Sequence, residues 1–330
     1  MSDGERAGSP VLELHDVAVY FGGRKGLLDR ERPVIRAVNG VSLTIGRAET
    51  VALVGESGCG KSTLSNAIVG LEPVQPGGSI RIGGDEVTGA SRRALRDIRR
   101  RVQMIFQDPA LSLDPRATIG AAIAEPLLVR GVARGAALKA RVARLLRQVG
   151  LRPEFASRYP HQFSGGQRQR VVIARALALE PDLVICDEPV SALDVSVRAQ
   201  ILNLLVELQR RTGVSYLFIS HDLGVVRHIA DRVVVMYLGR FVEIAERETF
   251  FAKAHHPYTR ALMSAVPEPD PVLQRGKERF PLHGELPSPA KIPRGCAFHT
   301  RCPLATEICS QSRPELTPRP DGAFVACHHV

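Results

Sequence analysis

The stretch Gly55-Glu56-Ser57-Gly58-Cys59-Gly60-Lys61-Ser62 constrains this chain most, because it matches the pattern G-x-x-x-x-G-K-[ST] in full. The apolar run 50–54 before it predicts a strand, and a helix is predicted from Lys61 onward. Glycines let such a loop curl so that its N–H groups and the start of the next helix point at phosphate oxygens. We expect Lys61 to reach the β- and γ-phosphates of a nucleotide and Ser62 to ligate magnesium.

Length and composition exclude several classes of protein. A chain of 330 residues can bury a core of roughly 200 to 250 residues and still hold a second, smaller unit. No apolar run approaches the roughly 20 residues of a membrane span, and residues 1–10 have no apolar signal core, so we expect a cytosolic protein. The formal charge of +10 is spread along predicted helices and only 5% of residues are aromatic, so no nucleic-acid partner is expected.

Strands and helices alternate along most of the chain. Apolar or alternating runs predict strands at 11–19, 34–45, 50–54, 79–82, 102–106, 183–186, 215–219 and 232–236. Residues 22–33 read as an exposed loop, Ser91 as the cap of a basic helix to about Arg101, and 111–159 as helical, with an amphipathic run at 136–149. Alternating strands and helices indicate an α/β fold with a mostly parallel sheet, here with an inserted helical subdomain.

Polar side chains follow the apolar strands where ligands of parallel sheets bind. Asp187 comes directly after the run 183–186 and could hold magnesium, while Glu188 could orient or deprotonate a water that attacks the γ-phosphorus. His221 follows the next strand, and Gln107 follows the strand 102–106. A lone histidine is usually an ordinary loop residue, but its place beside the other strand ends favours a γ-phosphate contact.

Two weaker features complete the pattern. Phe163-Ser164-Gly165-Gly166-Gln167 precedes a helix predicted from 168 to 179, and a hydroxyl with two glycines at a helix N-terminus makes an anion site. An aromatic residue at Tyr20 or Phe21 could stack on a base, although a core or rim aromatic explains this position about as well.

With these motifs in this order, the sequence resembles the ATP-binding subunits of ABC transporters. The segments 103–109, 112–116 and 256–262 and the cysteine-bearing tail narrow the resemblance to the oligopeptide/dipeptide importer branch, whose relatives carry peptides, glutathione or nickel. The resemblance implies a P-loop NTPase fold with an antiparallel β subdomain. It further implies an ATPase domain at 11–265, with its helical subdomain at about 111–170, and a tail domain at 266–330. Phe163 stands where the signature usually begins with leucine.

The resemblance also implies a set of site residues for ATP and Mg²⁺. The implied catalytic residues are Glu188, His221, Gln107 and Lys61, and the implied magnesium ligands are Ser62, Gln107 and Asp187. The implied nucleotide-binding residues are Phe21 (with Tyr20 as second choice), Gly55, Glu56, Ser57, Gly58, Cys59, Gly60, Lys61, Ser62, Thr63, Ser164, Gly165, Gly166, Gln167 and Asp194. Gln107 would also link to the membrane subunits, and Asp194 would bridge two sites.

The implied function is that of an ATPase subunit whose ATP-driven dimer closure powers peptide import from the cytoplasmic face of the cell membrane. Its implied partners are a second, related ATP-binding subunit in a heterodimer, two membrane permeases and, indirectly, an extracytoplasmic substrate-binding protein. A nickel or glutathione importer is the first alternative, because the cargo is chosen by the other subunits. A soluble ABC ATPase that acts on DNA or ribosomes is the second alternative, but such proteins usually carry two cassettes in one chain, or a coiled-coil or zinc insertion, and one cassette is present here. A purely regulatory or structural module would not be expected to keep Lys61, Glu188 and His221 together.

The six cysteines divide into two groups. Cys59 fills a variable position of the loop and Cys186 lies in an apolar strand, whereas Cys296, Cys302, Cys309 and Cys327 lie in the proline-rich tail with spacings of x5, x6 and x17. A reducing cytosol disfavours disulfides, and the C-x-x-C pairs of common zinc sites are missing. Four thiolates suit an iron–sulfur cluster, and four unligated thiols are the alternative. The resemblance implies a [4Fe-4S] cluster that folds the tail against the partner subunit, with zinc as the second choice.

Overall fold

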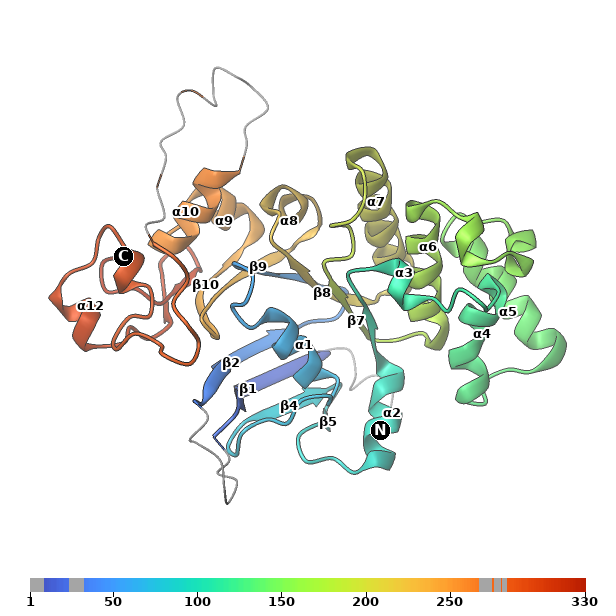
Figure 1. The fold of residues 1–330 in the computed structure, drawn as a ribbon, viewed down its shortest axis with the longest axis horizontal. Helices are drawn as coiled ribbons and strands as arrows, with labels where there is room; N and C mark the ends of the chain where they lie inside the picture. Colours follow the sequence, from blue (N-terminus) through green and yellow to red (C-terminus); the bar gives the residue numbers. More distant parts are fainter. Residues whose placement is uncertain (1–8, 24–32, 267–274, 276–279, 281–283) are drawn as a thin grey trace. The chain divides into compact units, whose positions relative to one another are not determined.

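The computed structural model describes residues 9–23, 33–266, 275, 280 and 284–330 (Figure 1). These residues divide into two compact units. The first unit contains residues up to 12, 45–49 and 81–219, and the second contains 13–44, 50–80 and 220–330. Both units are therefore assembled from segments that lie far apart in the sequence. Most of the predicted loop 22–33, from residue 24 to 32, lies outside the described residues.

The first unit combines a short parallel sheet with a group of helices. Its strands and α-helices are β5 (Asp85–Glu86), α2 (Arg92–Arg101), β6 (Val102–Ile105), α3 (Pro109–Ser112), α4 (Ile119–Val129), α5 (Gly135–Gln148), α6 (Gly165–Ala176), β7 (Leu183–Asp187), α7 (Val195–Thr212) and β8 (Ser215–Ser220). Three 3₁₀ turns accompany them at Pro153–Ser157, Pro160–Gln162 and Leu177–Leu179.

The strands of this unit run in the order β8-β7-β6, and each neighbouring pair is parallel. Four consecutive residues of β7, from Leu183 to Cys186, are buried, as expected for a parallel strand covered on both faces. The carboxyl ends of β6 and β7 therefore lie at the same edge, with Ile105 opposite Cys186. This edge presents the polar residues that follow each strand.

The helical part of the first unit packs around α4, α5 and α6, which lie together in Figure 1. Leu127 and Leu146 are fully buried, and Thr118 caps α4 by accepting a hydrogen bond from the N–H of Ala121 at 3.3 Å. Helix α6 begins at Gly165, three residues earlier than expected. Ser164 caps it with Gln167 in a reciprocal capping box, so the glycines lie inside the first turn.

The second unit contains the remaining strands and the tail. Its elements are β1 (Leu12–Phe21), β2 (Ile35–Ile45), β3 (Thr50–Val54), α1 (Lys61–Ile68), β4 (Ser79–Ile82), α8 (Leu223–Ile229), β9 (Arg232–Tyr237), β10 (Arg240–Glu246), α9 (Arg247–Ala252), α10 (Pro257–Ala265), a 3₁₀ turn at His299–Arg301, α12 (Glu307–Gln311), β11 (Thr317–Pro318) and β12 (Phe324–Val325). A few end residues of β1, β2 and β4 are grouped with the first unit.

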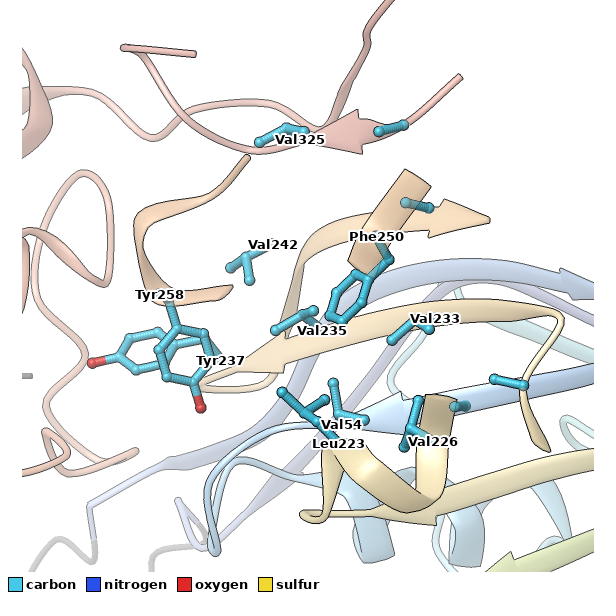
Figure 2. Close-up of a cluster of buried hydrophobic side chains, with 14 of the residues drawn as sticks. Val54, Leu223, Val226, Val233, Val235, Tyr237, Val242, Phe250, Tyr258 and Val325 are labelled. Atoms are coloured by element: carbon cyan, nitrogen blue, oxygen red, sulfur yellow. The ribbon is translucent and has the colours of Figure 1, made fainter. Parts of the chain in front are cut away.

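The tail is attached to the sheet of the second unit, in which strands follow the order β11-β12-β10-β9-β3. Strand β9 is parallel to β3 and antiparallel to β10, and β12 adds to the free edge of β10 with Val325 opposite Glu243. Figure 2 shows Val325 in the same buried cluster as Tyr237, Tyr258 and Phe250. Strands β10, β11 and β12 were not predicted, and the two tail strands have only two residues each, too few to show a period.

Within the described residues, no helix combines the length and apolar character needed to cross a membrane.

Candidate nucleotide site

The loop Gly55–Ser62 connects β3 to α1 in the second unit, as predicted. Two of its glycines are required by their surroundings. Gly60 has φ of 111°, and a Cβ there would lie 2.1 Å from the carbonyl oxygen of Ala37. A Cβ on Gly55 would lie 2.3 Å from the carbonyl oxygen of Met236. A side chain at either position would collide with this backbone and displace the loop. The loop can therefore keep the conformation that brings its N–H groups near a phosphate only if both positions are glycine.

The side chain of Lys61 lies inside this loop. It is 7% exposed, and its Nζ donates to the carbonyl oxygens of Gly55 and Glu56 at 2.8 and 2.9 Å. Ser62 is exposed and Thr63 half-buried at the start of α1. Cys59 is buried, and its burial raises the pKa of its thiol, which disfavours the thiolate. The conformations of the glycines and the position of the Lys61 side chain inside the loop fit the binding of a nucleoside triphosphate.

Glu188 and Gln107 meet in the first unit, at the carboxyl ends of β7 and β6. The Nε2 of Gln107 donates to the Glu188 Oε2 at 3.1 Å. Glu188 has φ of 49°, uncommon for a residue with a side chain, and its N–H donates to the carbonyl oxygen of Ile219 at 3.1 Å. The hydroxyl of Ser191 donates to the Glu188 carbonyl oxygen at 3.0 Å, so the residue is held on three sides. Asp187 is the last residue of β7.

The signature segment lies exposed at the start of α6, also in the first unit. Ser164 Oγ accepts from the N–H of Gln167, and Ser164 and Gly165 are exposed. Gly166 is buried, and a Cβ there would lie 2.4 Å from Cγ1 of Val197. Asp194 is exposed at the N-cap of α7. This surface can offer a hydroxyl and backbone N–H groups to an anion on another molecule.

The remaining predicted residues lie in the second unit. His221 is exposed between β8 and α8, next to Asp222, whose carboxylate accepts from the N–H of Gly224 at 2.9 Å. At the end of β1, the Tyr20 hydroxyl donates to Asn39 Oδ1 at 2.9 Å and the Arg36 guanidinium lies over the Tyr20 ring. The Phe21 side chain is 36% exposed. These contacts engage Tyr20 and leave Phe21 as the better surface for a base.

Three of the four tail cysteines, Cys296, Cys302 and Cys327, have a raised thiol pKa. Burial, with a smaller contribution from neighbouring thiolates, raises the pKa of Cys296 to about 11 and that of Cys302 and Cys327. Cys309 Sγ lies 3.3 Å from Nε2 of His329. Yet among the described residues no three His, Cys, Asp or Glu side chains are placed so that they could hold a metal ion. The described arrangement therefore does not support the predicted iron–sulfur cluster or the zinc alternative.

Sequence analysis missed one set of contacts to the phosphate loop. The guanidinium of Arg301 donates to both carboxylate oxygens of Glu56, at 2.7 and 3.1 Å, and the Tyr258 hydroxyl accepts from the N–H of Glu56 at 2.8 Å. The ion pair joins residues 245 positions apart, so no local pattern signals it. Tyr258 lies in the segment 256–262, which the sequence linked to a family resemblance but not to the phosphate loop.

Comparison with known proteins decides the family. A family model described as ABC transporter matches residues 38–191, and one described as oligopeptide/dipeptide transporter, C-terminal region, matches residues 242–309. A probable peptide ABC transporter ATP-binding protein of Sinorhizobium fredii is 51% identical over 96% of this chain and 89% of its own length. The chain belongs to the ABC transporter family.

Other relatives agree with this placement of the ABC transporter chain. An oligopeptide transport ATP-binding protein of Salmonella typhimurium is 51% identical over 97% of this chain and 96% of its own. A solved dimeric ATP-binding cassette bound to ADP and Pi is 30% identical, with a TM-score of 0.62, covering 72% of this chain and 98% of that one. CbiO1 of Clostridium perfringens is 27% identical, with a TM-score of 0.64, covering 74% and 91%. The predicted α/β P-loop fold and the predicted family are confirmed.

Proposed function

We propose that this ABC transporter chain is the ATP-hydrolysing subunit of a peptide importer and works at the cytoplasmic face of the membrane. The observation that carries the proposal is the phosphate loop, in which Gly55 and Gly60 admit no side chain and the Lys61 ammonium lies inside. The relatives are named as peptide, oligopeptide and dipeptide transport ATP-binding proteins, which supports peptides as the cargo. A division into an ATPase domain at 11–265 and a tail domain at 266–330 belongs to the same proposal.

Each site residue has a proposed role. Lys61 binds the β- and γ-phosphates, with the N–H groups of the loop, while Ser62, Asp187 and Gln107 would hold Mg²⁺ and Phe21 would carry the adenine. Mg²⁺ bound to ATP would neutralise phosphate charge. Glu188 takes the proton of the attacking water, and the amide of Gln107 at 3.1 Å orients its carboxylate. His221 contacts the γ-phosphate.

The exposed signature segment supports a composite site with another ATP-binding subunit. Ser164, Gly165, Gly166 and Gln167 would contact the nucleotide on a partner's phosphate loop, and Asp194 would bridge the two sites. We propose a related but non-identical subunit as the partner, with two permeases in the membrane and a substrate-binding protein outside. A nickel or glutathione importer with the same ATPase role is the second candidate, and the relatives' names favour peptides over it.

The tail metal remains a separate proposal. The spacing of the four tail cysteines supports a cluster, although the described side chains are not arranged as ligands. Iron and sulfide analysis of anaerobically purified protein tests it. Stoichiometric iron with a brown colour supports the cluster, stoichiometric zinc supports the alternative, and four titratable tail thiols without metal reject both.

Peptide uptake in cells that lack this chain tests the proposed function. We expect the wild-type gene to restore uptake of a labelled dipeptide, and Lys61→Ala to fail although the protein is made at normal levels, because the phosphates lose their cation. Uptake of labelled nickel and glutathione is measured in the same cells. If the wild-type gene restores uptake of nickel or glutathione and not of the dipeptide, the second candidate, a nickel or glutathione importer, replaces the peptide importer.

A further inference from the structure

In the phosphate loop, the backbone N–H, the carbonyl oxygen and the carboxylate of Glu56 each have a hydrogen-bond partner. Its N–H donates to the Tyr258 hydroxyl at 2.8 Å, and its carbonyl oxygen accepts from Lys61 Nζ at 2.9 Å. Its carboxylate accepts two hydrogen bonds from Arg301, at 2.7 and 3.1 Å. Two of these partners, Tyr258 and Arg301, come from the last quarter of the chain. The tail therefore contacts the phosphate loop directly.

Arg301 is buried and packs beside a cluster of aromatic rings. Its side chain is 6% exposed, whereas that of Glu56 is 27% exposed, and its guanidinium lies 6.0 Å from the centre of the Tyr237 ring. Tyr237 lies next to Tyr258 (Figure 2), and it packs edge-on against Tyr258 and Phe298, with ring centroids 4.8 and 5.3 Å apart. A bidentate guanidinium held this firmly loses little freedom on pairing, so it sets the position of the Glu56 carboxylate.

The charge of Glu56 gives this ion pair a consequence for ligand binding. A carboxylate in a loop that is built for phosphates repels an anionic ligand unless a cation neutralises it. Arg301 supplies that cation, and the hydrogen bonds from its guanidinium to Glu56 raise the pKa of Arg301, so the guanidinium stays charged. Because Lys61 also contacts Glu56, movement of this residue would move the lysine.

We propose that Arg301 is a positioning residue for the nucleotide: by pairing with Glu56 it holds the phosphate loop in its binding conformation and neutralises a carboxylate that would otherwise repel the phosphates. The tail segment around Arg301 is thereby part of the nucleotide site, together with the hydroxyl of Tyr258. This inference deepens the proposed function and rests on it.

Nucleotide affinity of the full-length chain tests the proposal, measured by titration with a fluorescent ATP derivative in the presence of Mg²⁺. We expect Arg301→Gln to raise the Kd about tenfold, because it leaves Glu56 unpaired, and Glu56→Gln to raise it only about twofold. The double variant should bind like Glu56→Gln alone. The effect of Arg301→Gln should also be larger for ATP than for the corresponding ADP derivative, because the repulsion grows with the phosphate charge.

Two further variants separate positioning from mere packing. Tyr258→Phe removes only the hydroxyl that accepts from the Glu56 N–H, and we expect it to raise the Kd about threefold without the ATP-over-ADP bias. Arg313→Gln is the matched control, because Arg313 is an exposed tail arginine whose partner is Glu315 at 3.5 Å. It should bind like wild type. Thermal unfolding of each variant, recorded without nucleotide, shows whether the fold is retained.

The outcomes are distinct. Equal affinity of folded Arg301→Gln and wild type, or a double variant that binds as weakly as Arg301→Gln, would overturn the inference. If Arg301→Gln does not fold, unchanged affinity of Tyr258→Phe overturns it. A wild-type chain that binds neither derivative would instead reject the proposed function.

Discussion

Glu188 shows how single residues of this chain are held for a task. Its φ of 49° is a conformation that most side chains avoid, and a backbone hydrogen bond to Ile219 and the hydroxyl of Ser191 hold it there. Gln107 then orients one carboxylate oxygen at 3.1 Å.

His256 is a buried histidine of the second unit. It is 1% exposed, and its Nδ1 accepts from the N–H of Tyr258 at 3.0 Å.

We expect Glu188→Gln to bind ATP with Mg²⁺ almost as well as wild type but to hydrolyse it about 10²- to 10⁴-fold more slowly in the assembled complex, because an amide cannot take a proton from water. Steady-state phosphate release and nucleotide titration measure the two effects separately. Glu207→Gln is the matched control, since Glu207 pairs with Arg211 on the exposed face of α7. Hydrolysis of ATP by Glu188→Gln at the wild-type rate would show that Glu188 is not the base that takes the proton from water.

Burial lowers the pKa of His256 from 6.5 to about 3, so the folded protein binds fewer protons than the unfolded chain between these values. Stability from this site is complete above pH 6.5 and is lost as the pH falls, by up to about 1.4 kcal/mol per pH unit. Burial raises the pKa of nearby Glu243, which acts in the opposite direction. We therefore compare wild type with His256→Asn, which keeps a capping acceptor but does not titrate. Urea unfolding at pH 7.0 and 5.0 should show a smaller loss in the variant, and equal losses would contradict the assignment.

At the scale of elements, the edge of β10 shows how the tail is joined to the second unit. Strand β12 pairs there through only two residues, yet Val325 is fully buried whereas Phe324 is 44% exposed. Two backbone N–H groups, of His255 and His256, donate to the buried Glu243 carboxylate opposite Val325 at 2.9 and 2.8 Å. At this edge, the tail strand thus contributes a buried apolar side chain opposite a buried acid whose carboxylate is fully hydrogen-bonded.

This arrangement predicts unequal effects for neighbouring residues of β12. Val325→Ser removes apolar contacts and buries a hydroxyl, so we expect it to lower the free energy of unfolding by about 2 to 3 kcal/mol. Phe324→Ser, one residue away and exposed, should lower it by less than about 1 kcal/mol. Urea denaturation followed by circular dichroism measures both. Similar losses for the two variants would show that the joint is not organised around Val325.

Local patterns predicted the elements that carry the chemistry and missed those that join distant segments. The run 50–54 and the lysine at position 61 predicted β3 and the start of α1 at their observed bounds. Strand β10 was missed, although it follows β9 across the short turn at Leu238-Gly239. The start of α6 was wrong by three residues because Ser164 was read as a ligand-binding loop residue and its capping box with Gln167 was overlooked. The roles of the site residues stay predictions, and Arg301 could be found only from the structure.

At the scale of the whole molecule, the chain exposes a signature segment that its own phosphate loop is not expected to use. We therefore expect the isolated chain to hydrolyse ATP weakly, and ATP to promote its association with a related subunit. Light scattering of chromatographed protein with and without ATP measures this association. Equal association of the two subunits with and without ATP would contradict the proposal that the nucleotide is bound between them.

Ser164→Arg places bulk and charge where a partner's γ-phosphate would be bound, and we expect at least about a tenfold loss of hydrolysis at that site in the complex. The change also removes the N-cap of α6, worth about 1 kcal/mol. Ser164→Asn keeps a capping side chain and controls for that loss. Ser157→Arg adds the same charge at another exposed serine of the first unit. Full activity of a complex that contains Ser164→Arg would count against the composite site.

The ion pair between Glu56 and Arg301 joins residues 245 positions apart, so a ribosome has made the phosphate loop long before it makes the cation that steadies it. A nascent or prematurely terminated chain that stops before the 3₁₀ turn at 299–301 carries a full G-x-x-x-x-G-K-[ST] motif with a bare carboxylate inside it. On the proposed role of Arg301, we expect such a fragment to hold ATP less tightly than the full-length chain. Nucleotide binding at one end of the sequence would thereby depend on a side chain that is translated late.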